Sequence, residues 1–297
     1  MVGEKYTELM KQLTFEDDGS RYFRQSVKMG KAFHGLNVHI QYGSCGETGA
    51  MGGEFSGMHI HKFDQLLLWM GSDVDNLIEL GAEIELCLGE EREKHLFTVP
   101  TAVAVPKGLP HFPATIRNVD RPFQYMEISL APEFQAISVP SDDSVPEAPL
   151  VSGFQAKYRK HIFNLPFRRK GPYFYGANNP EDSGGVISFI TGKESGLDLH
   201  ISYESIKNAP YTFGPAPHRP HAHKFEEILL FMGADCNNLN EVGVEGVMEM
   251  GKERVKHAFA GPTAIVCPYQ LPHCPLTVTK VDKPFLFMVV SCAAEHH

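Results

Sequence analysis

The chain carries an internal duplication of domain size, and this repeat limits the possible folds more than any other feature. At an offset of 162 residues, at which His59 falls on His221, the 297-residue sequence matches itself without a gap from about Met58 to Ser129. Roughly half of the aligned positions are identical, so the repeat is a duplicated unit and not a short motif that occurs twice. The period is far too long for a solenoid, and the sequence therefore predicts two domains of one fold.

Composition separates the two copies. The stretch "SVPSDDSVPEAPLVSG", residues 138–153, is rich in proline, serine and acidic residues, which is typical of a linker. We therefore predict an N-terminal domain over residues 1–138, a linker over 139–153 and a C-terminal domain over 154–297.

Each copy shows the period-two alternation of β-strands. In "LDLHISYE", residues 197–204, apolar side chains alternate with Asp198, His200 and Ser202. Short apolar runs such as "EILLFMG" and "FLFMVVS" are bounded by glycine or proline, as buried strands commonly are. Only residues 4–13 and 155–165 have a helical pattern. The sequence predicts an all-β fold, a sandwich or barrel in each copy, with a short N-terminal helix.

Charge and composition exclude several classes of protein. The net charge is −9 and there is no basic block, so we expect no nucleic-acid partner. No apolar run reaches the ~18 residues of a membrane span, and the first residues lack the apolar region of a secretory signal. The six cysteines form no CxxC pair, which favours reduced thiols in a cytoplasmic protein. The expected partner is a small-molecule substrate, and a homo-oligomer is compatible with these features.

The second copy contains a set of potential metal ligands at the mouth of an apolar strand. On a strand His221 and His223 face the same side, and Glu227 follows four residues later on that side. His273 lies at the start of a later apolar strand. Three imidazoles and one carboxylate converging inside a barrel form a ligand set for a divalent first-row metal, and the carboxylate limits the cost of burying its charge.

These motifs resemble those of a known family. The spacing of His221, His223, Glu227 and Gly233 is similar to the first cupin motif, and "PKGLPH", residues 106–111, is similar to the second. With two copies, the chain resembles the bicupins, the cupin superfamily members with two cupin domains. The resemblance covers most of the chain. It implies two tandem jelly-roll β-barrels, each with a metal in its mouth, and therefore up to two metals per chain.

The first copy departs from the motif in one ligand. Its set is His59, His61, Gln65 and His111, with a neutral glutamine where the second copy has glutamate. Some cupin enzymes have a similar neutral ligand, so Gln65 does not mark a dead site. It leaves the metal more positive, hence a stronger Lewis acid that is more weakly bound. In the second copy Gln270 replaces the motif's glycine, which does not affect His273.

Four further residues are candidates for the pocket walls. His39 and His200 lie on the polar face of an early strand and are either pocket groups or ordinary surface residues. Trp69 and Phe231 occupy one aligned position and either pack the barrel core or stack on a substrate. The sequence assigns a catalytic role to no residue.

Fold alone does not select a reaction, so three hypotheses stay open. The first is a metal-dependent oxidoreductase or lyase that holds Fe or Mn and acts on a small oxygen-rich substrate, dioxygenase-like or decarboxylase-like. The second is a Lewis-acid isomerase, hydrolase or lyase of sugar-like or keto-acid substrates, for which Zn or Ni would also serve. The third is a bicupin that binds small molecules without turnover.

Overall fold

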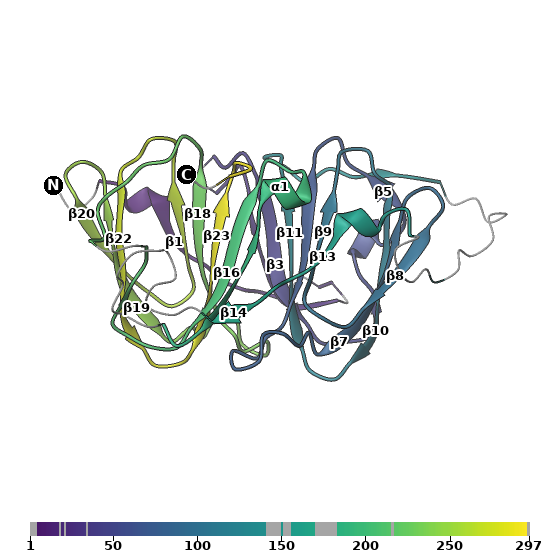
Figure 1. The fold of residues 1–297 in the computed structure, drawn as a ribbon, viewed down its shortest axis with the longest axis horizontal. Coiled ribbons are helices and arrows are strands. Elements are labelled where there is room, and N and C mark those ends of the chain that lie inside the picture. The colour runs from purple at the N-terminus through teal and green to yellow at the C-terminus, as the bar shows by residue number, and fades with distance from the viewer. Residues whose placement is uncertain are drawn as a thin grey trace. The chain divides into compact units, whose positions relative to one another are not determined.

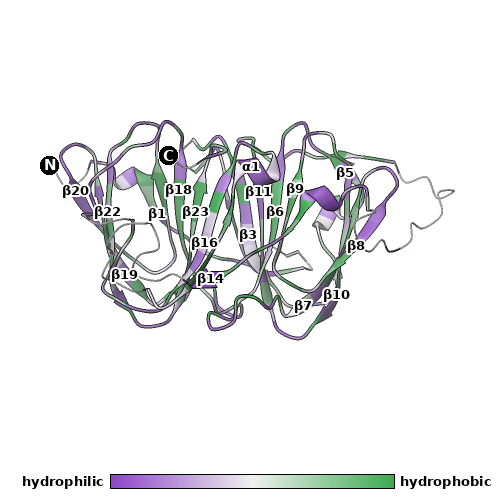
Figure 2. Ribbon diagram, viewed as in Figure 1, coloured by the Kyte–Doolittle hydropathy of each residue, from purple (hydrophilic) through white to green (hydrophobic). Residues whose placement is uncertain are grey.

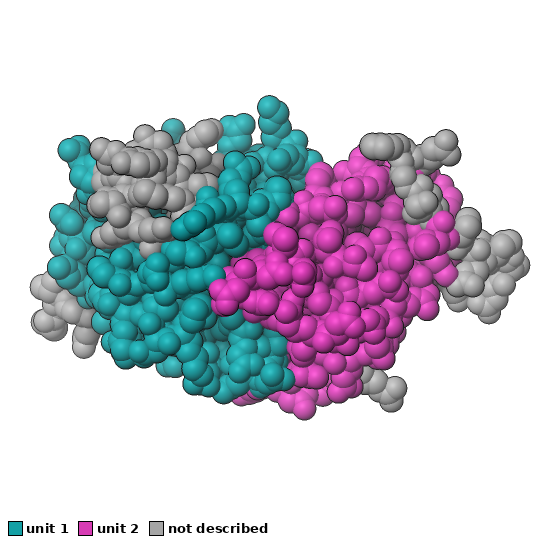
Figure 3. Space-filling view, turned by 60° about the horizontal axis from the view of Figure 1, so that its bottom comes forward, with its two compact units in different colours: residues 1–14, 166–297 teal, residues 15–165 magenta. Residues whose placement is uncertain are grey.

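The computed structural model describes residues 5–17, 19–20, 22–33, 35–140, 150, 156–169, 183–214 and 217–295. The chain forms two compact units, which Figure 3 colours separately. We call residues 15–165 the first barrel, and residues 1–14 together with 166–297 the second barrel. The predicted linker, residues 139–153, lies mostly outside the described residues.

The ends of these units differ from those of the predicted segments because each barrel takes an edge strand from the N-terminal end of the segment predicted for the other. Strand β1 (Met10–Gln12) pairs antiparallel with β21 (Thr263–Cys267) in the second barrel. Strand β13 (Ile162–Asn164) pairs in the same way with β9 (Thr101–Val105) in the first.

These two strands also account for a difference in the predicted helices. Within residues 4–13 only Thr7–Leu9 is helical, as a single 3₁₀ turn before β1. Within residues 155–165 only Arg159–His161 forms such a turn, before β13. A helix of this length is marginal in isolation, whereas a sheet edge offers unpaired backbone groups to a neighbouring strand. Sheet pairing therefore overrides the helical pattern.

The first barrel consists of two facing antiparallel sheets. One has the order β13-β9-β6-β11-β3-β2, and the other β12-β5-β10-β7-β8 with β4 paired to β10. Their remaining strands are β2 (Phe23–Met29), β3 (His39–Cys45), β4 (Gly49–Ala50), β5 (His59–Ile60), β6 (Gln65–Met70), β7 (Ala82–Leu88), β8 (Glu93–Phe97), β10 (His111–Val119), β11 (Phe123–Ser129) and β12 (Ile137–Ser138). A 3₁₀ turn, Gly53–Phe55, precedes β5.

The second barrel repeats this arrangement of two facing antiparallel sheets (Figure 1). Its sheets have the orders β1-β21-β18-β23-β16-β15-β14 and β17-β22-β19-β20. Their remaining strands are β14 (Arg168–Arg169), β15 (Val186–Ile190), β16 (His200–Ile206), β17 (Tyr211–Thr212), β18 (Glu227–Met232), β19 (Val244–Met250), β20 (Val255–Ala260), β22 (His273–Val281) and β23 (Phe285–Ser291). The one described α-helix, α1 (Gly192–Ser195), begins with a capping box formed by Thr191 and Glu194. The all-β prediction is confirmed.

Each core lies between the two sheets of its barrel. In the first barrel Leu67 and Tyr125 of one sheet pack with Ile84 and Ile116 of the other. In the second barrel the core likewise combines Leu229 of one sheet with residues of β19 and β22. Apolar strands such as β6 and β9 are green in Figure 2, whereas the more exposed β8 is purple. Burial of one face of each sheet follows from the period-two pattern.

The six cysteines all lie in described residues, and no disulfide joins any of them. Among the described residues, no helix has the length and apolar character needed to cross a membrane.

Candidate metal centres

The second barrel brings its three predicted histidines together. His221 pairs through its backbone with His273, the first residue of β22. Each residue donates its backbone N–H to the carbonyl oxygen of the other, with N to O distances of 3.0 and 2.9 Å. One ring nitrogen from each of His221, His223 and His273 lies within 4.8 Å of the other two. The strand pairing thus places residues fifty positions apart in the sequence around one point.

Hydrogen bonds to the backbone orient these rings. The Nδ1 atom of His273 bonds to the carbonyl oxygen of Leu271 at 2.9 Å, and that of His221 makes a longer contact of 3.4 Å to Arg219. Because Nδ1–H donates a hydrogen bond to the carbonyl oxygen, the proton stays on Nδ1 and the lone pair of Nε2 is directed to a metal.

Glu227, the first residue of β18, completes the set. Its carboxylate oxygens lie 3.3 Å from Nε2 of His273 and 3.7 Å from Nε2 of His223, and the residue is 3 % exposed. Donor atoms bound at ~2.1 Å to one ion lie roughly 3 Å or more from each other, so these spacings suit a shared metal. The side chains of the second barrel therefore fit a site of three histidines and one carboxylate.

The first barrel has an equivalent cluster. One ring nitrogen from each of His59, His61 and His111 lies within 4.8 Å of the others, and all three residues are buried. Their Nδ1 atoms bond to the carbonyl oxygens of Gly57, Gln135 and Leu109 at 2.8, 2.6 and 3.0 Å. The Nε2 atoms of His61 and His111 have no hydrogen-bond partner among the described residues. Buried acceptors without a partner are unusual, and a bound metal would satisfy them.

Gln65, the fourth predicted ligand of the first barrel, is oriented by two hydrogen bonds. Its Nε2 donates to Glu127 Oε2 and to Ser129 Oγ, both at 3.2 Å, and its buried Oε1 has no partner among the described residues. The hydrogen bond to Glu127 places the amide nitrogen of Gln65 on that side, which leaves Oε1 at the other end. Oε1 is the atom that would bind a metal.

Sequence reasoning missed Glu127. Burial raises the pKa of this carboxyl to about 7, against the opposing effects of Lys28 and the Gln65 hydrogen bond. A signal was present in the repeat: Glu127 lies two residues before Ser129, on the same strand face, where the second copy has Val289. The first barrel thus has a half-buried carboxyl group beside its proposed glutamine ligand, where the second barrel has a glutamate among the ligands themselves.

Burial favours the neutral form of four cluster histidines, His59, His61, His111 and His221, and metal binding requires neutral imidazoles. Burial lowers the pKa of His59 to about 4, and it lowers the pKa of His61 as well. The pKa of His111 falls well below its usual value through burial and, next, through the two neighbouring imidazoles. His221 is exposed as a residue, yet loss of water around its ring still lowers its pKa to about 4.

The four predicted wall residues have different positions. His39 lines a cavity of about 620 Å³ in the first barrel. His200 lies opposite Ser291 in the sheet, and its ring centroid is 6.0 Å from that of Phe189. It is not among the described residues that line the cavity at the second cluster. Trp69 and Phe231 are each 0 % exposed and pack in the apolar cores. Both lie deeper along their strands than the metal ligands, so core packing, not stacking on a substrate, is what their burial supports.

Both clusters face a cavity. That of the second barrel has a volume of about 540 Å³ and is walled by Phe213, Leu229, Leu276, Phe287 and Val289, with His218 and Arg219 also in its lining. That of the first barrel has a volume of about 350 Å³ and is more polar, with Lys28, Gln41 and Glu127 near His59. The two copies share ligand positions but not pocket chemistry.

The fold was then compared with known proteins. No protein-family model and no curated protein matched the sequence. A solved structure of oxalate decarboxylase superposes with a TM-score of 0.60 at 10% identity, over 97% of this chain and 78% of that one. A structure concerned with the Mn(II) centres of Bacillus subtilis oxalate decarboxylase gives 0.57 at 11% identity, over the same shares. AerE from Microcystis aeruginosa gives 0.52 at 11% identity, over 96% of this chain and 99% of that one.

At these identities the likeness establishes the fold. Two jelly-roll barrels, each with a histidine cluster inside, are what the duplicated motifs predicted. The chain therefore has the two-barrel fold that its resemblance to the bicupins implied.

Proposed function

We propose that the chain is a metal-dependent enzyme that uses Mn(II) or Fe(II) in the second barrel to act on a small oxygen-rich substrate, by a decarboxylase-type or dioxygenase-type reaction. The observation that carries this proposal is the placement of Glu227 within 3.3 and 3.7 Å of two ligand imidazoles, at a cavity of about 540 Å³. The likeness to a decarboxylase with Mn(II) centres supports the same reading.

Four side chains of the second barrel would hold this metal. His221, His223 and His273 would hold the ion through Nε2, and Glu227 would offset half of its charge. A bound ion of this kind supplies Lewis acidity and, for Mn or Fe, access to a second oxidation state. The apolar wall, which includes Phe213 and Phe287, keeps bulk water away and so strengthens electrostatic interactions at the cluster.

The cavity lining suggests the shape of the substrate. Arg219 presents a permanent positive charge, suited to a carboxylate. Beside it, the buried Nδ1 of His218 has no hydrogen-bond partner among the described residues. The remaining walls are mostly apolar. We therefore propose a substrate with one carboxylate or similar oxygen-rich end and a small apolar body.

The first barrel supports a second candidate, Lewis-acid chemistry of the isomerase, hydrolase or lyase kind. All four of its proposed ligands are neutral, so a divalent ion there would keep its full charge. Glu127 lies beside the ligand Gln65 and lines the same cavity as His59, so it can form a hydrogen bond to a bound substrate. Zn or Ni would serve this chemistry as well as Mn or Fe.

The test begins with element analysis of untagged protein, followed by loading with Mn, Fe or Zn. Short mono- and dicarboxylic acids, hydroxy acids and dihydroxylated aromatic acids are then screened for CO2 release and O2 uptake. We expect turnover with Mn or Fe and none with Zn. His273→Ala should abolish it and His111→Ala should leave it in place.

The other outcomes separate the hypotheses. Turnover that tolerates Zn and is lost only in His111→Ala supports the Lewis-acid candidate. Full turnover in both variants means that neither cluster is catalytic. A protein that binds members of the panel without converting any of them is the non-catalytic bicupin.

Two remaining expectations are kept as proposals. Six cysteines without a disulfide favour a reducing compartment, and we propose a cytoplasmic location, checked by fractionation of the source cells. A homo-oligomer is also proposed, and light scattering of the purified protein measures it directly.

A further inference from the structure

One row of side chains on the inner face of the first barrel carries charges that the second barrel lacks. Strand register places Lys28 of β2 opposite Gln41 of β3, and Gln41 opposite Glu127 of β11. Directly opposed residues on neighbouring strands lie about 5 Å apart at Cβ, so the three side chains form a continuous polar row.

The same row in the second barrel has a different chemistry. There Phe189 lies opposite Ser202, and Ser202 opposite Val289. Two residues further along these strands the barrels match. Ser129 lies opposite Gln65 in the first barrel, and Ser291 lies opposite Glu227 in the second. The copies therefore keep the metal ligands and differ in the adjacent row, which is where a bound ligand would be recognised.

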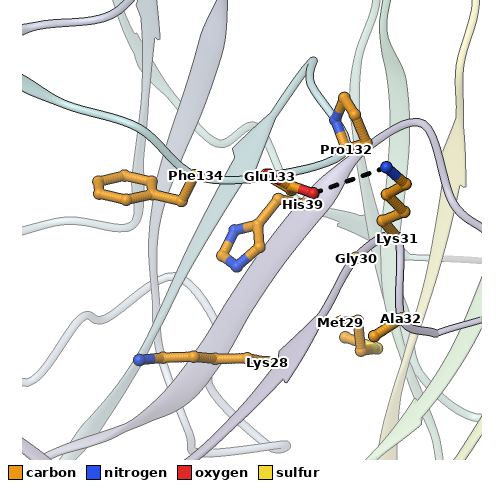
Figure 4. Close-up of a pocket in the computed structure, with 9 residues that line it drawn as sticks. All are labelled: Lys28, Met29, Gly30, Lys31, Ala32, His39, Pro132, Glu133 and Phe134. Atoms are coloured by element: carbon orange, nitrogen blue, oxygen red, sulfur yellow. Dashed lines mark ion pairs between the residues drawn. The ribbon is translucent and has the colours of Figure 1, made fainter.

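Lys28 is the cationic member of this row, and its charge also acts on the carboxyl group of Glu127. No carboxylate of the described residues lies within 4 Å of its Nζ. Neighbouring Lys31, by contrast, pairs with Glu133 at 3.8 Å. Figure 4 shows the Lys28 ammonium extending below the His39 ring, toward the side on which Phe134 lies, while Lys31 reaches the opposite side.

Two adjoining cavities have Lys28 in their walls. The cavity of about 350 Å³ includes His59, Lys28, Gln41 and Glu127, and that of about 620 Å³ includes His39 and Lys28. Phe134 borders both, and its ring centroid lies 5.1 Å from that of the ligand His61. The ammonium of Lys28 is therefore accessible to a ligand that also reaches the histidine cluster.

We propose that the first barrel binds a small carboxylate anion between its metal ligands and Lys28. The charges of a divalent ion and of Lys28 exceed those of Glu127 and of Glu54, the two acidic residues that line the smaller cavity. Gln41 offers an amide to a second oxygen of the ligand, so a dicarboxylate or hydroxy acid is the class that fits. The inference goes beyond the reaction proposed for the second barrel and rests on the proposed function only through the metal at His59, His61 and His111.

The test is calorimetric titration of metal-loaded protein with malonate, with neutral malonamide as the matched ligand. Malonate should bind and malonamide should not. Lys28→Met should weaken malonate binding about 10–100-fold, the range for loss of a hydrogen bond to a charged group. Lys31→Met is the control variant and should leave the affinity unchanged. Melting curves and element analysis of each sample verify that folding and metal content are equal.

Each outcome bears on the proposal. The proposal is overturned if malonate still binds with the same affinity in Lys28→Met. It is also overturned if malonamide binds as well as malonate. Malonate bound in the second barrel would appear as a component that does not depend on Lys28. A protein that takes up no metal under any loading condition refutes the proposed metal enzyme. Malonate binding that still depends on Lys28 in that protein supports the anion site on its own.

Discussion

Acid should destabilise the metal-free first barrel, and His59 gives the clearest contribution. The residue is 3 % exposed, and burial lowers its pKa to about 4. In the unfolded chain the same ring titrates near ~6.5. The unfolded state therefore binds the proton first, so the stability present above pH ~6.5 is lost as the pH falls toward 4.

The size of the effect follows from the two pKa values. Between pH 7 and pH 4, a ring with a folded pKa of about 4 lowers the free energy of unfolding by ~3 kcal/mol. Ring centroids of His59 and His111 lie 4.3 Å apart, so protonating both in the folded state is less favourable still. The ~3 kcal/mol is therefore the share of one ring in a larger acid effect.

The assay uses the chain's single tryptophan. Trp69 is buried in the core of the first barrel, so its fluorescence in urea reports on that barrel. Chelator-treated protein and its His59→Gln variant are unfolded at a series of pH values. We expect the free energy of unfolding of the variant to depend less steeply on pH, with a slope smaller by ~1.4 kcal/mol per pH unit between pH 6.5 and 4, which corresponds to one proton. Equal slopes in the two proteins would refute the burial argument, whatever their absolute stabilities.

Three other predictions concern the ligands, the core and the thiols. Glu227→Gln should weaken metal retention in the second barrel by at least ~10–100-fold, and Gln65→Glu should strengthen metal retention in the first barrel. In wild-type protein, metal counting during mild chelation should show that one equivalent of metal leaves first. An unchanged order of release in Glu227→Gln would rule out Glu227 as a ligand. Phe231→Ala should cost ~3–5 kcal/mol of stability in urea, because the ring is 0 % exposed. Burial raises the pKa of Cys267 well above its usual value and that of Cys274 to about 12, so iodoacetamide at pH 8 should leave both thiols unmodified until the protein unfolds, as peptide mass spectrometry would show.

The ligand clusters could be anticipated because their information is local and repeated. His221 and His223 share a strand face through the two-residue period, and the offset of 162 residues places His59 and His61 in the same relation. The same repeat marked His111 and His273 as partners. Two copies of one pattern favour function over chance, and the two histidine clusters lie where that pattern predicts.

The sequence by itself thus determined the duplication, the all-β class and the histidine sets. Only the tertiary structure brought Glu127, Gln41 and Lys28 into one row, since cross-strand register joins residues that no local period connects. It also decided that Met10–Gln12 closes a sheet edge in the second barrel and not in the first. The physical reason is the same in both cases: side-chain direction is set within a strand, but its neighbours are set by pairing with strands far away in the chain.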